Sequence, residues 1–230
     1  MRAFLAALTF LGLVQAPMAL AENGPVVVEL YTSQGCSSCP PADSMLHDLA
    51  ARSDVIALAL HVDYWDYIGW KDSFGRAENT QRQHAYARAA RATTVYTPQM
   101  VFNGQEHIVG SRAMQVMDAL QSQLARGQEF DVQLTRSGNR VSVRAAPGQY
   151  GDYVVQLVRY MPQATVDIRR GENAGRTITY VNIVTAWDEI GRWDGRTPLN
   201  IAATISGEDA VVAIVQHAGH GPIVGAAQLR

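Results

Sequence analysis

Both cysteines of this 230-residue chain lie three positions apart, as Cys36 and Cys39 in the stretch GCSSCPP. Such a pair can form a structural disulfide, bind a metal ion or act as a reactive dithiol. With no second cysteine pair, a four-thiolate zinc site is excluded within one chain. A disulfide here closes a four-residue ring. Because so small a loop contributes only about 2 kcal/mol of chain entropy, a purely structural bond is the weaker interpretation.

The residues around the pair predict a strand before it and a helix from it. PVVVELY (residues 25–31) is a short β-branched run typical of a buried strand, and PADSMLHDLAAR (residues 41–52) has apolar positions at helical spacing. Pro40 and Pro41 are tolerated in the first turn of a helix, where the missing N–H groups have no partner. The helix should therefore begin between Cys36 and Pro41.

This position favours redox chemistry. Unpaired N–H groups and the positive end of the dipole stabilise a thiolate at a helix N-terminus, and the thiolate is the nucleophile. Cys36 is nearer that end, so we expect Cys36 to attack and Cys39 to resolve the mixed disulfide. The Ser37-Ser38 pair between them leaves the direction of electron flow open.

The first half of the chain reads as a mixed four-stranded sheet with flanking helices. VIALALHVD (55–63) is a second buried strand, parallel to the first in a right-handed βαβ unit. Residues 76–92 read as a helix, with Glu78 and Arg82 placed to pair on its exposed face. A hairpin around Asn103-Gly104 and a helix over 111–126, capped by Ser111 and Gly127, complete the expected order.

The second half changes character at Gly127-Gln128. A hairpin around Gly138-Asn139 and then short strands separated by Gly, Pro, Asn and Asp predict an all-β, sandwich-like domain. We therefore expect an α/β domain at 22–127 and a β-sandwich-like domain at 128–230. Residues 1–21 are expected to be a signal peptide, for the reasons given below.

The order of elements over residues 25–126 resembles the thioredoxin fold. Pro98 heads the strand after the second helix, in VYTPQMVFNG. The resemblance implies that the Thr97–Pro98 bond is cis, that Pro98 packs against the cysteine pair, and that the backbone of Thr97 can pair with an extended substrate segment.

A third segment, HVDYWDYIGW, leaves the carboxyl end of the second strand. Ligands of parallel α/β sheets bind beyond these ends, so Asp63, Tyr64 and Trp65 are candidates to line a substrate site beside the cysteines. The alternative is that the aromatic residues here cover the end of the sheet or contact the second half.

Histidines raise two metal alternatives. His61 with the two thiols could hold copper, although a histidine ending a buried strand is more often a hydrogen-bonded core residue. His217 and His220 could bind a metal weakly, but they fit a polar turn better. Our leading interpretation includes no metal and no cofactor.

Four segments together, YTSQGCSSCPPAD, HVDYWDYIGWKD, VYTPQMVFNG and GENAGRTITYVNIV, resemble a family of exported bacterial thioredoxin-like proteins, the domain of unknown function 1223. The resemblance implies a thioredoxin-like domain joined to a β-rich one and supplies no substrate. GENAG (171–175) by itself reads as a turn with no assigned chemistry.

The N-terminus predicts export. Arg2, a short apolar run and the Ala19-Leu20-Ala21 pattern form a secretory signal peptide, so we expect a periplasmic or secreted protein with no stable membrane insertion after cleavage. The balance of 19 basic and 21 acidic residues argues against a nucleic-acid partner.

Two functions from different classes follow. The first is a thiol–disulfide oxidoreductase acting on protein or small thiols, or with a redox partner protein. The second is a non-catalytic binding module on a thioredoxin scaffold, with a permanent disulfide between Cys36 and Cys39.

Overall fold

The computed structural model describes residues 24–230, so the expected signal peptide lies outside the described residues. In chain order its elements are β1 (Val26–Thr32), α1 (Pro40–Ala50), β2 (Val55–His61), the short 3-10 helix η1 (Asp66–Ile68), α2 (Ala77–Ala89), β3 (Gln99–Phe102), β4 (Glu106–Val109), α3 (Ala113–Arg126), β5 (Val132–Ser137), β6 (Arg140–Ala145), β7 (Tyr153–Asp167), β8 (Thr177–Trp193), β9 (Leu199–Thr204), β10 (Ala210–His217) and β11 (Ile223–Leu229). None of the helices in this range is long and apolar enough to cross a bilayer.

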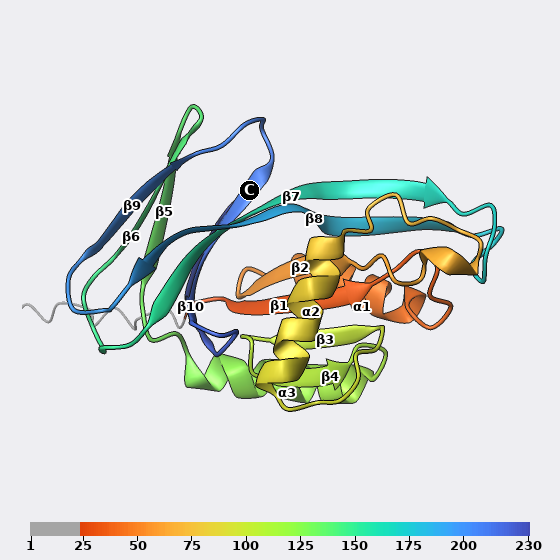
Figure 1. The fold of residues 1–230 in the computed structure, drawn as a ribbon, viewed down its shortest axis with the longest axis horizontal. Helices are drawn as coiled ribbons and strands as arrows, with labels where there is room; N and C mark the ends of the chain where they lie inside the picture. Colours follow the sequence, from red (N-terminus) through yellow and green to blue (C-terminus); the bar gives the residue numbers. More distant parts are fainter. Residues whose placement is uncertain (1–23) are drawn as a thin grey trace, which may run out of the picture.

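Within the described residues the fold is mixed α/β (Figure 1). One sheet has eight strands in the order β11-β10-β7-β8-β2-β1-β3-β4, and a smaller antiparallel sheet has the order β5-β6-β9. The segment β2-β1-β3-β4 has the predicted arrangement, since β1 and β2 are parallel and β3 is antiparallel to β1. The predicted hairpin between β3 and β4 turns at Asn103 and Gly104, which have positive φ angles of 44° and 68°.

One face of β1 and β2 packs against α1 and α3. Alternate residues of the strands point to this face, and they form a buried cluster with one stripe of each helix. The cluster consists of Val26, Val28, Leu30, Ala42, Leu46, Leu49, Val55, Ala57, Ala59, Met100, Phe102, Val116, Ala119, Leu120 and Val181. Thr32 and His61 continue the same two rows at the carboxyl ends of the strands, where the face becomes polar.

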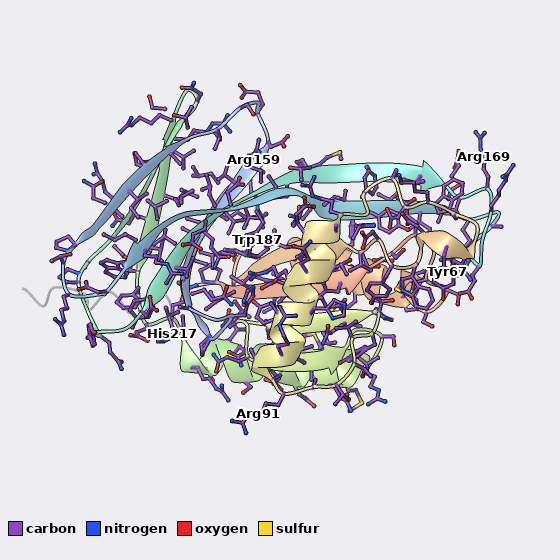
Figure 2. The ribbon with its side chains drawn as sticks, viewed as in Figure 1. Tyr67, Arg91, Arg159, Arg169, Trp187 and His217 are labelled. Atoms are coloured by element: carbon purple, nitrogen blue, oxygen red, sulfur yellow. A yellow bond between two sulfur atoms is a disulfide. The ribbon has the colours of Figure 1, made fainter. Side chains whose placement is uncertain are left out.

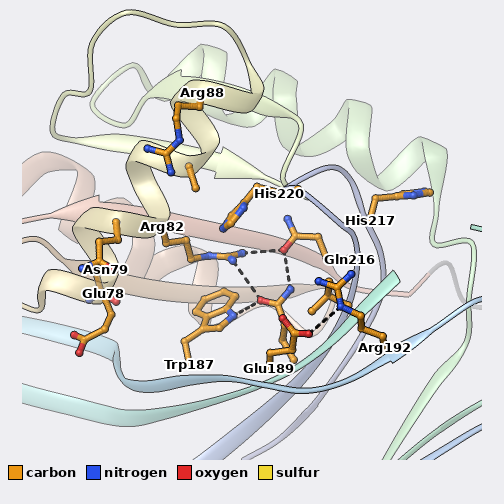
Figure 3. Close-up of a pocket in the computed structure, with 15 residues that line it drawn as sticks. Glu78, Asn79, Arg82, Arg88, Trp187, Glu189, Arg192, Gln216, His217 and His220 are labelled. Carbon is orange, nitrogen blue, oxygen red and sulfur yellow. Dashed lines mark hydrogen bonds and ion pairs between the residues drawn. The ribbon is translucent and has the colours of Figure 1, made fainter. Parts of the chain in front are cut away.

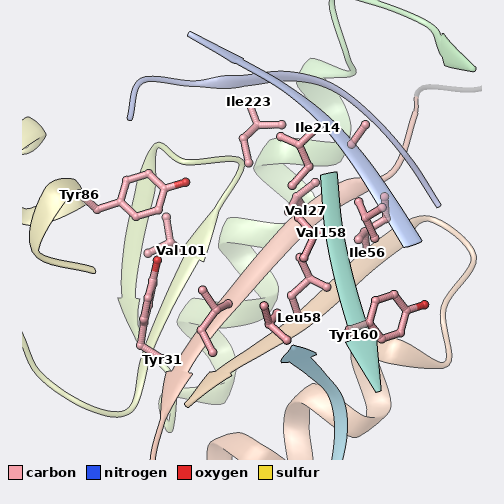
Figure 4. Close-up of a cluster of buried hydrophobic side chains, with 14 of the residues drawn as sticks. Val27, Tyr31, Ile56, Leu58, Tyr86, Val101, Val158, Tyr160, Ile214 and Ile223 are labelled. Carbon is pink, nitrogen blue, oxygen red and sulfur yellow. The ribbon is translucent and has the colours of Figure 1, made fainter. Parts of the chain in front are cut away.

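The other face is covered by α2 and by strands from the second half of the chain. Val27, Ile56 and Leu58 share one apolar cluster with Val158 of β7 and Ile214 of β10. Figure 4 shows β10 and β11 crossing over β1 and β2 on this side. The large sheet therefore coils back over its own central strands.

Within the described residues, the second half thus has the small sheet β5-β6-β9 to itself, but its strands β7, β8, β10 and β11 belong to the large sheet, whereas the prediction placed the whole half in a sandwich-like domain of its own. β8 joins the central sheet through the pair Ala59–Ile183, and the buried Asn182 side chain donates to the carbonyl of Ala57 at 2.8 Å. The hairpin β7–β8 is also longer than predicted, because β7 continues through the exposed Pro162. Pro162 is tolerated there because the ladder skips it together with Asn182 on β8.

A sandwich-like core does form between the two sheets, and β10 contributes to it with one of its two faces. Val211, Ala213 and Val215 face the small sheet, whereas Val212 and Ile214 face the central strands. Burial of both faces accounts for the continuous apolar run AVVAIV, which lacks the alternation of a half-exposed strand.

A buried ion pair lies on the α2 side of the large sheet. Arg82 donates to both carboxylate oxygens of Glu29, at 2.7 and 2.9 Å, and Tyr86 donates to the same carboxylate at 2.6 Å. The expected exposed pair of Glu78 with Arg82 is wrong, because α2 turns Arg82 into the core and Glu78 lies near Arg76 instead.

The same guanidinium reaches the second half of the chain. It donates to Gln156 of β7 and Gln216 of β10, each at 3.3 Å, and its central carbon lies 3.7 Å from the ring centre of Trp187 on β8. Arg82 therefore links α2, the central strands and the second half.

We predict that Arg82→Ala lowers the free energy of unfolding by about 3–5 kcal/mol, because it leaves the Glu29 charge buried without its partner. Urea denaturation of the oxidised protein measures this. Arg192→Ala is the matched control: its side chain is 61% exposed, and its ion pairs should contribute less than about 1 kcal/mol. Equal effects of the two substitutions on the free energy of unfolding would contradict the role of Arg82 as the partner of the buried Glu29 charge.

Candidate functional site

The cysteine pair lies between the end of β1 and the start of α1. Cys36 and Cys39 are at disulfide distance, with sulfur atoms 2.13 Å apart and Cα atoms 5.4 Å apart. Cys36 is 3% exposed and Cys39 is fully buried, while Ser37 and Ser38 between them are exposed. Both cysteines are thus buried, and Cys36 is the more exposed of the two by a small margin.

Local hydrogen bonds explain the shape of this segment. The N–H of Cys39 donates to the carbonyl of Cys36 at 3.2 Å, and the carbonyl of Cys39 accepts from Ala42 and Asp43. Cys39 is thus the residue before the helix, and Pro40 and Pro41 occupy its first turn as predicted. Cys36 lies in the turn that leads into the helix rather than on it.

The predicted rim residue Trp65 connects the cysteine loop to the Pro98 strand. Its indole N–H donates to the hydroxyl of Thr97 at 2.8 Å. Its Cβ atom lies 3.3 Å from the position of a Cβ on Gly35, the residue before Cys36, so a larger residue there would press against Cβ of Trp65. The structure therefore brings Trp65 and Thr97 together beside the cysteines.

Pro98 lies near the first turn of α1, and the Thr97–Pro98 bond is cis, as the thioredoxin resemblance implies. A Cβ built on Gly110 would lie 3.1 Å from Cβ of Ala42 and 3.3 Å from Cβ of Pro98. These two side chains therefore adjoin the same glycine, and Ala42 follows Cys39 by three positions.

The other two rim candidates point toward α2. Asp63 accepts from the hydroxyl of Thr80 at 2.6 Å, and Tyr64 donates to Gln83 at 3.2 Å. Burial raises the pKa of Tyr64 to about 12. Both side chains are half-buried, and these hydrogen bonds direct them to α2.

Sequence reasoning missed one contributor, the turn between β7 and β8. Asn173 is 1% exposed and donates to the carbonyls of Gln34 and Cys36, at 3.0 and 2.9 Å. Glu172 accepts from the N–H of Ser37 at 3.3 Å. Figure 2 shows Arg169 of this turn and Tyr67 of η1 at the same end of the molecule. The only signal in the sequence was the presence of GENAG among the four segments that resemble the family.

Buried polar groups lie where the face under α1 becomes polar. The hydroxyl of Thr32 donates to Asp43 at 2.7 Å. His61, which pairs with Thr32 across β1 and β2, is hydrogen-bonded through Nδ1 to Asp72 at 2.7 Å. Tyr180 packs edge-on against His61, with ring centres 4.7 Å apart. Asp43 Oδ2, His61 Nε2 and the hydroxyl of Tyr180 are buried and have no hydrogen-bond partner among residues 24–230.

The two carboxyl groups of this cluster are shifted in opposite directions. Burial raises the pKa of Asp43 to about 7, and the charge of Asp72 adds to the shift. Burial also opposes ionisation of Asp72, but the facing His61 and the N–H donors of Gln34 and Phe74 outweigh it and lower the pKa of Asp72. Asp43 can therefore exchange a proton near neutral pH, whereas Asp72 stays ionised and orients His61.

The metal alternatives gain no support. Among the described residues, no three His, Cys, Asp or Glu side chains gather as ligands of a metal ion. His61 is fully buried and hydrogen-bonded to Asp72, which matches the core interpretation. His220 lies in the turn between β10 and β11, as expected.

A separate cavity of about 500 Å³ opens between α2 and strands β7, β8 and β10 (Figure 3). It is lined in part by Arg82, Trp187, Glu189 and His220. Neither the cysteines nor the predicted residues Asp63, Tyr64, Trp65, Thr97 and Pro98 line it, so it is distinct from the cysteine site.

Residues 27–216 match the family described as "Protein of unknown function (DUF1223)". The chain belongs to this family. The crystal structure of protein AGR_C_4864 from Agrobacterium tumefaciens is similar to this DUF1223 protein, with 34% sequence identity, a TM-score of 0.79, and coverage of 90% of this chain and 95% of that one.

A second structural match, superoxide reductase from Nanoarchaeum equitans, has 12% identity and a TM-score of 0.22, and covers 44% of this chain and 90% of that one. A TM-score this low carries no argument about fold or function. No curated protein matches the sequence.

For this DUF1223 protein we predict that Asp43→Asn changes the pH dependence of stability. The folded-state pKa of about 7 lies above the ordinary 3.8. The native state therefore holds a proton that the unfolded chain releases, so the Asp43 contribution is fully present below pH 4 and is lost as the pH rises to 7. Between pH 4 and pH 8, the free energy of unfolding of the variant should rise by roughly 2–4 kcal/mol relative to that of wild type. Urea denaturation of the oxidised proteins measures this difference.

Asp48→Asn, which changes an exposed carboxylate on the same helix, is the control and should show no such trend. If the Asp43→Asn and wild-type profiles run parallel from pH 4 to 8, Asp43 does not carry the raised pKa.

Proposed function

We propose that this protein is an exported thiol–disulfide oxidoreductase on a thioredoxin-like scaffold. The observation that carries the proposal is the Cys36–Cys39 pair at disulfide distance, in the turn that starts α1 and at the carboxyl end of β1. The β2-β1-β3-β4 arrangement and the family membership support it. Export is supported by the predicted signal peptide and by the oxidising compartments in which disulfides persist.

The exchange reaction involves two sulfurs with different tasks. A substrate thiolate attacks Sγ of Cys36, the bond between the two cysteine sulfurs breaks, and its electron pair goes to Sγ of Cys39. In the reverse step Cys39, as thiolate, attacks the mixed disulfide at Cys36 and releases the substrate thiolate. The first N–H groups of α1 favour the thiolate form of a sulfur at this end of the helix.

Asp43 is placed to serve the proton of Cys39. The two residues lie four positions apart, so they share one face of the helix start, and both are buried. Protonated Asp43 can give its proton to the Cys39 sulfur as it leaves, and the carboxylate can take it back before Cys39 attacks. Thr32 holds the other carboxyl oxygen in place.

The substrate would lie along the rim formed by Trp65, Thr97 and Pro98. The Trp65–Thr97 hydrogen bond fixes the position of the loop before the cis-proline, and this loop lies beside the cysteine loop. An extended substrate segment can pair with the backbone of Thr97. Asp63 and Tyr64 support this rim from the α2 side.

We predict that wild-type protein catalyses insulin reduction by dithiothreitol and that Cys36→Ser abolishes it, because the variant cannot form the mixed disulfide. Turbidity of precipitating insulin chains measures the rate. Ser38→Ala, which changes an exposed residue between the cysteines, serves as the control and should keep activity. Equal, negligible rates for wild type and Cys36→Ser would refute the proposed function.

A second prediction concerns the resolving step. Cys39→Ala should accumulate a mixed disulfide between Cys36 and a protein thiol or small thiol, because no second sulfur releases the substrate. Non-reducing electrophoresis and intact mass of the protein recovered from an extract measure it. Cys36→Ser treated in the same way is the control. Adducts in equal yield on both variants would contradict the assigned roles.

The burial of both cysteines favours a second candidate function, a binding module with a permanent disulfide. In that case the aromatic rim binds a ligand or partner, and Cys36 never exchanges. The two functions differ in how readily the disulfide is reduced.

A further inference from the structure

The tip of the turn between β7 and β8 points the side chain of Asn173 inward. The N–H of Ile168 donates to the carbonyl of Arg176 at 2.9 Å, and the N–H of Gly175 donates to the carbonyl of Ile168 at 2.8 Å. Glu172 and Ala174 on either side of Asn173 are exposed, while Asn173 is 1% exposed. A polar side chain buried at the tip of a hairpin requires a partner, because an unpaired buried amide is costly.

The partners of its NH₂ group are two carbonyls of the cysteine loop, while its Oδ1 has no hydrogen-bond partner among residues 24–230. Asn173 Nδ2 donates to the carbonyl of Gln34 at 3.0 Å and to the carbonyl of Cys36 at 2.9 Å. The amide must present its NH₂ group here, since the opposite orientation would place Oδ1 against two carbonyl oxygens. Because the two N–H groups have a fixed angle, they also fix the separation of the two carbonyls on either side of Gly35.

The carbonyl of Cys36 has a second task. It accepts from the N–H of Cys39 at 3.2 Å, and this bond closes the turn that holds the two sulfurs at bonding distance. Other supports of the loop act on Ser37, whose N–H donates to Glu172, and on Gln34, whose N–H donates to Asp72 at 2.8 Å and whose side chain accepts from Trp70 at 2.8 Å. Among the described residues, the side chain that hydrogen-bonds to the Cys36 carbonyl itself is that of Asn173.

We propose that Asn173 is a positioning residue for the cysteine pair, supplied by the second half of the chain to hold the Cys36–Cys39 turn. Asn173 favours the turn geometry in which the two sulfurs are at bonding distance, so it stabilises the oxidised turn more than the dithiol, whose sulfurs can move apart. This raises the effective concentration of one sulfur at the other and favours the disulfide. The inference deepens the proposed function and rests on it, because positioning matters for a pair that is reversibly reduced.

The test compares Asn173→Ala with wild type in glutathione redox buffers. We expect the equilibrium constant of the pair to shift toward the dithiol by roughly two- to tenfold, the range that one net hydrogen bond supports. Ala174→Ser, which changes the exposed neighbour, is the matched control and should leave the constant unchanged. Alkylation of quenched samples followed by mass spectrometry measures the oxidised fraction.

Thermal melting of both redox forms separates positioning from a merely structural role. A structural role would lower the melting temperature of the oxidised and reduced variant equally and leave the glutathione equilibrium constant unchanged, and this result would overturn the proposal. Positioning predicts a larger loss in the oxidised form. If Asn173→Ala does not fold, Asn173→Ser, whose single short hydroxyl cannot reach both carbonyls, is measured in its place with the same expectations.

The glutathione titration does not depend on a protein substrate. Failure of wild type to reduce insulin, together with a shifted constant in Asn173→Ala, would remove the proposed function and keep the positioning role. Insulin reduction by wild type with an unshifted constant in the variant would remove the positioning role alone.

Discussion

The joining of β8 to β2 determines how the cysteine site is built. Through the Ala59–Ile183 pair and the Asn182 bond to Ala57, the long β7–β8 hairpin becomes part of the same sheet as β1 and β2. The turn at its end then lies against the cysteine loop and delivers Asn173 to the carbonyl of Cys36. Residues from both halves of the chain therefore form the site, whereas the predicted domain boundary at Gly127 placed it in the first half alone.

Polar groups are buried on both faces of the central strands, with different consequences. On the α2 face Glu29 and Arg82 neutralise each other, and the guanidinium also holds strands of the second half. On the α1 face, Thr32 is the one residue of 24–230 that donates a hydrogen bond to the Asp43 carboxylate, and burial raises the pKa of Asp43 to about 7. The first arrangement stabilises the fold, whereas the second keeps a titratable proton behind the cysteine pair at some cost in stability.

Local signals in the sequence were sufficient for the main elements of the first half and for the cysteine turn, but not for the length of the β7–β8 hairpin. Apolar spacing predicted β1, α1 and β2, and the two prolines marked the first turn of α1, because these features depend on neighbours in the chain. Arg82 was misplaced because an i,i+4 pattern on a helix does not say which face is buried; the partner, Glu29, is 53 positions away. Asn173 was missed for the same reason, since its contact with Cys36 spans 137 positions.

The reduction potential of the Cys36–Cys39 pair tests the proposed function most directly. Equilibration of the protein with glutathione and dithiothreitol buffers, followed by alkylation and mass spectrometry, gives its value. A reactive dithiol predicts a potential between about −270 and −120 mV, the range of known disulfide oxidoreductases. A potential below about −300 mV would show a permanent structural disulfide and contradict the oxidoreductase function.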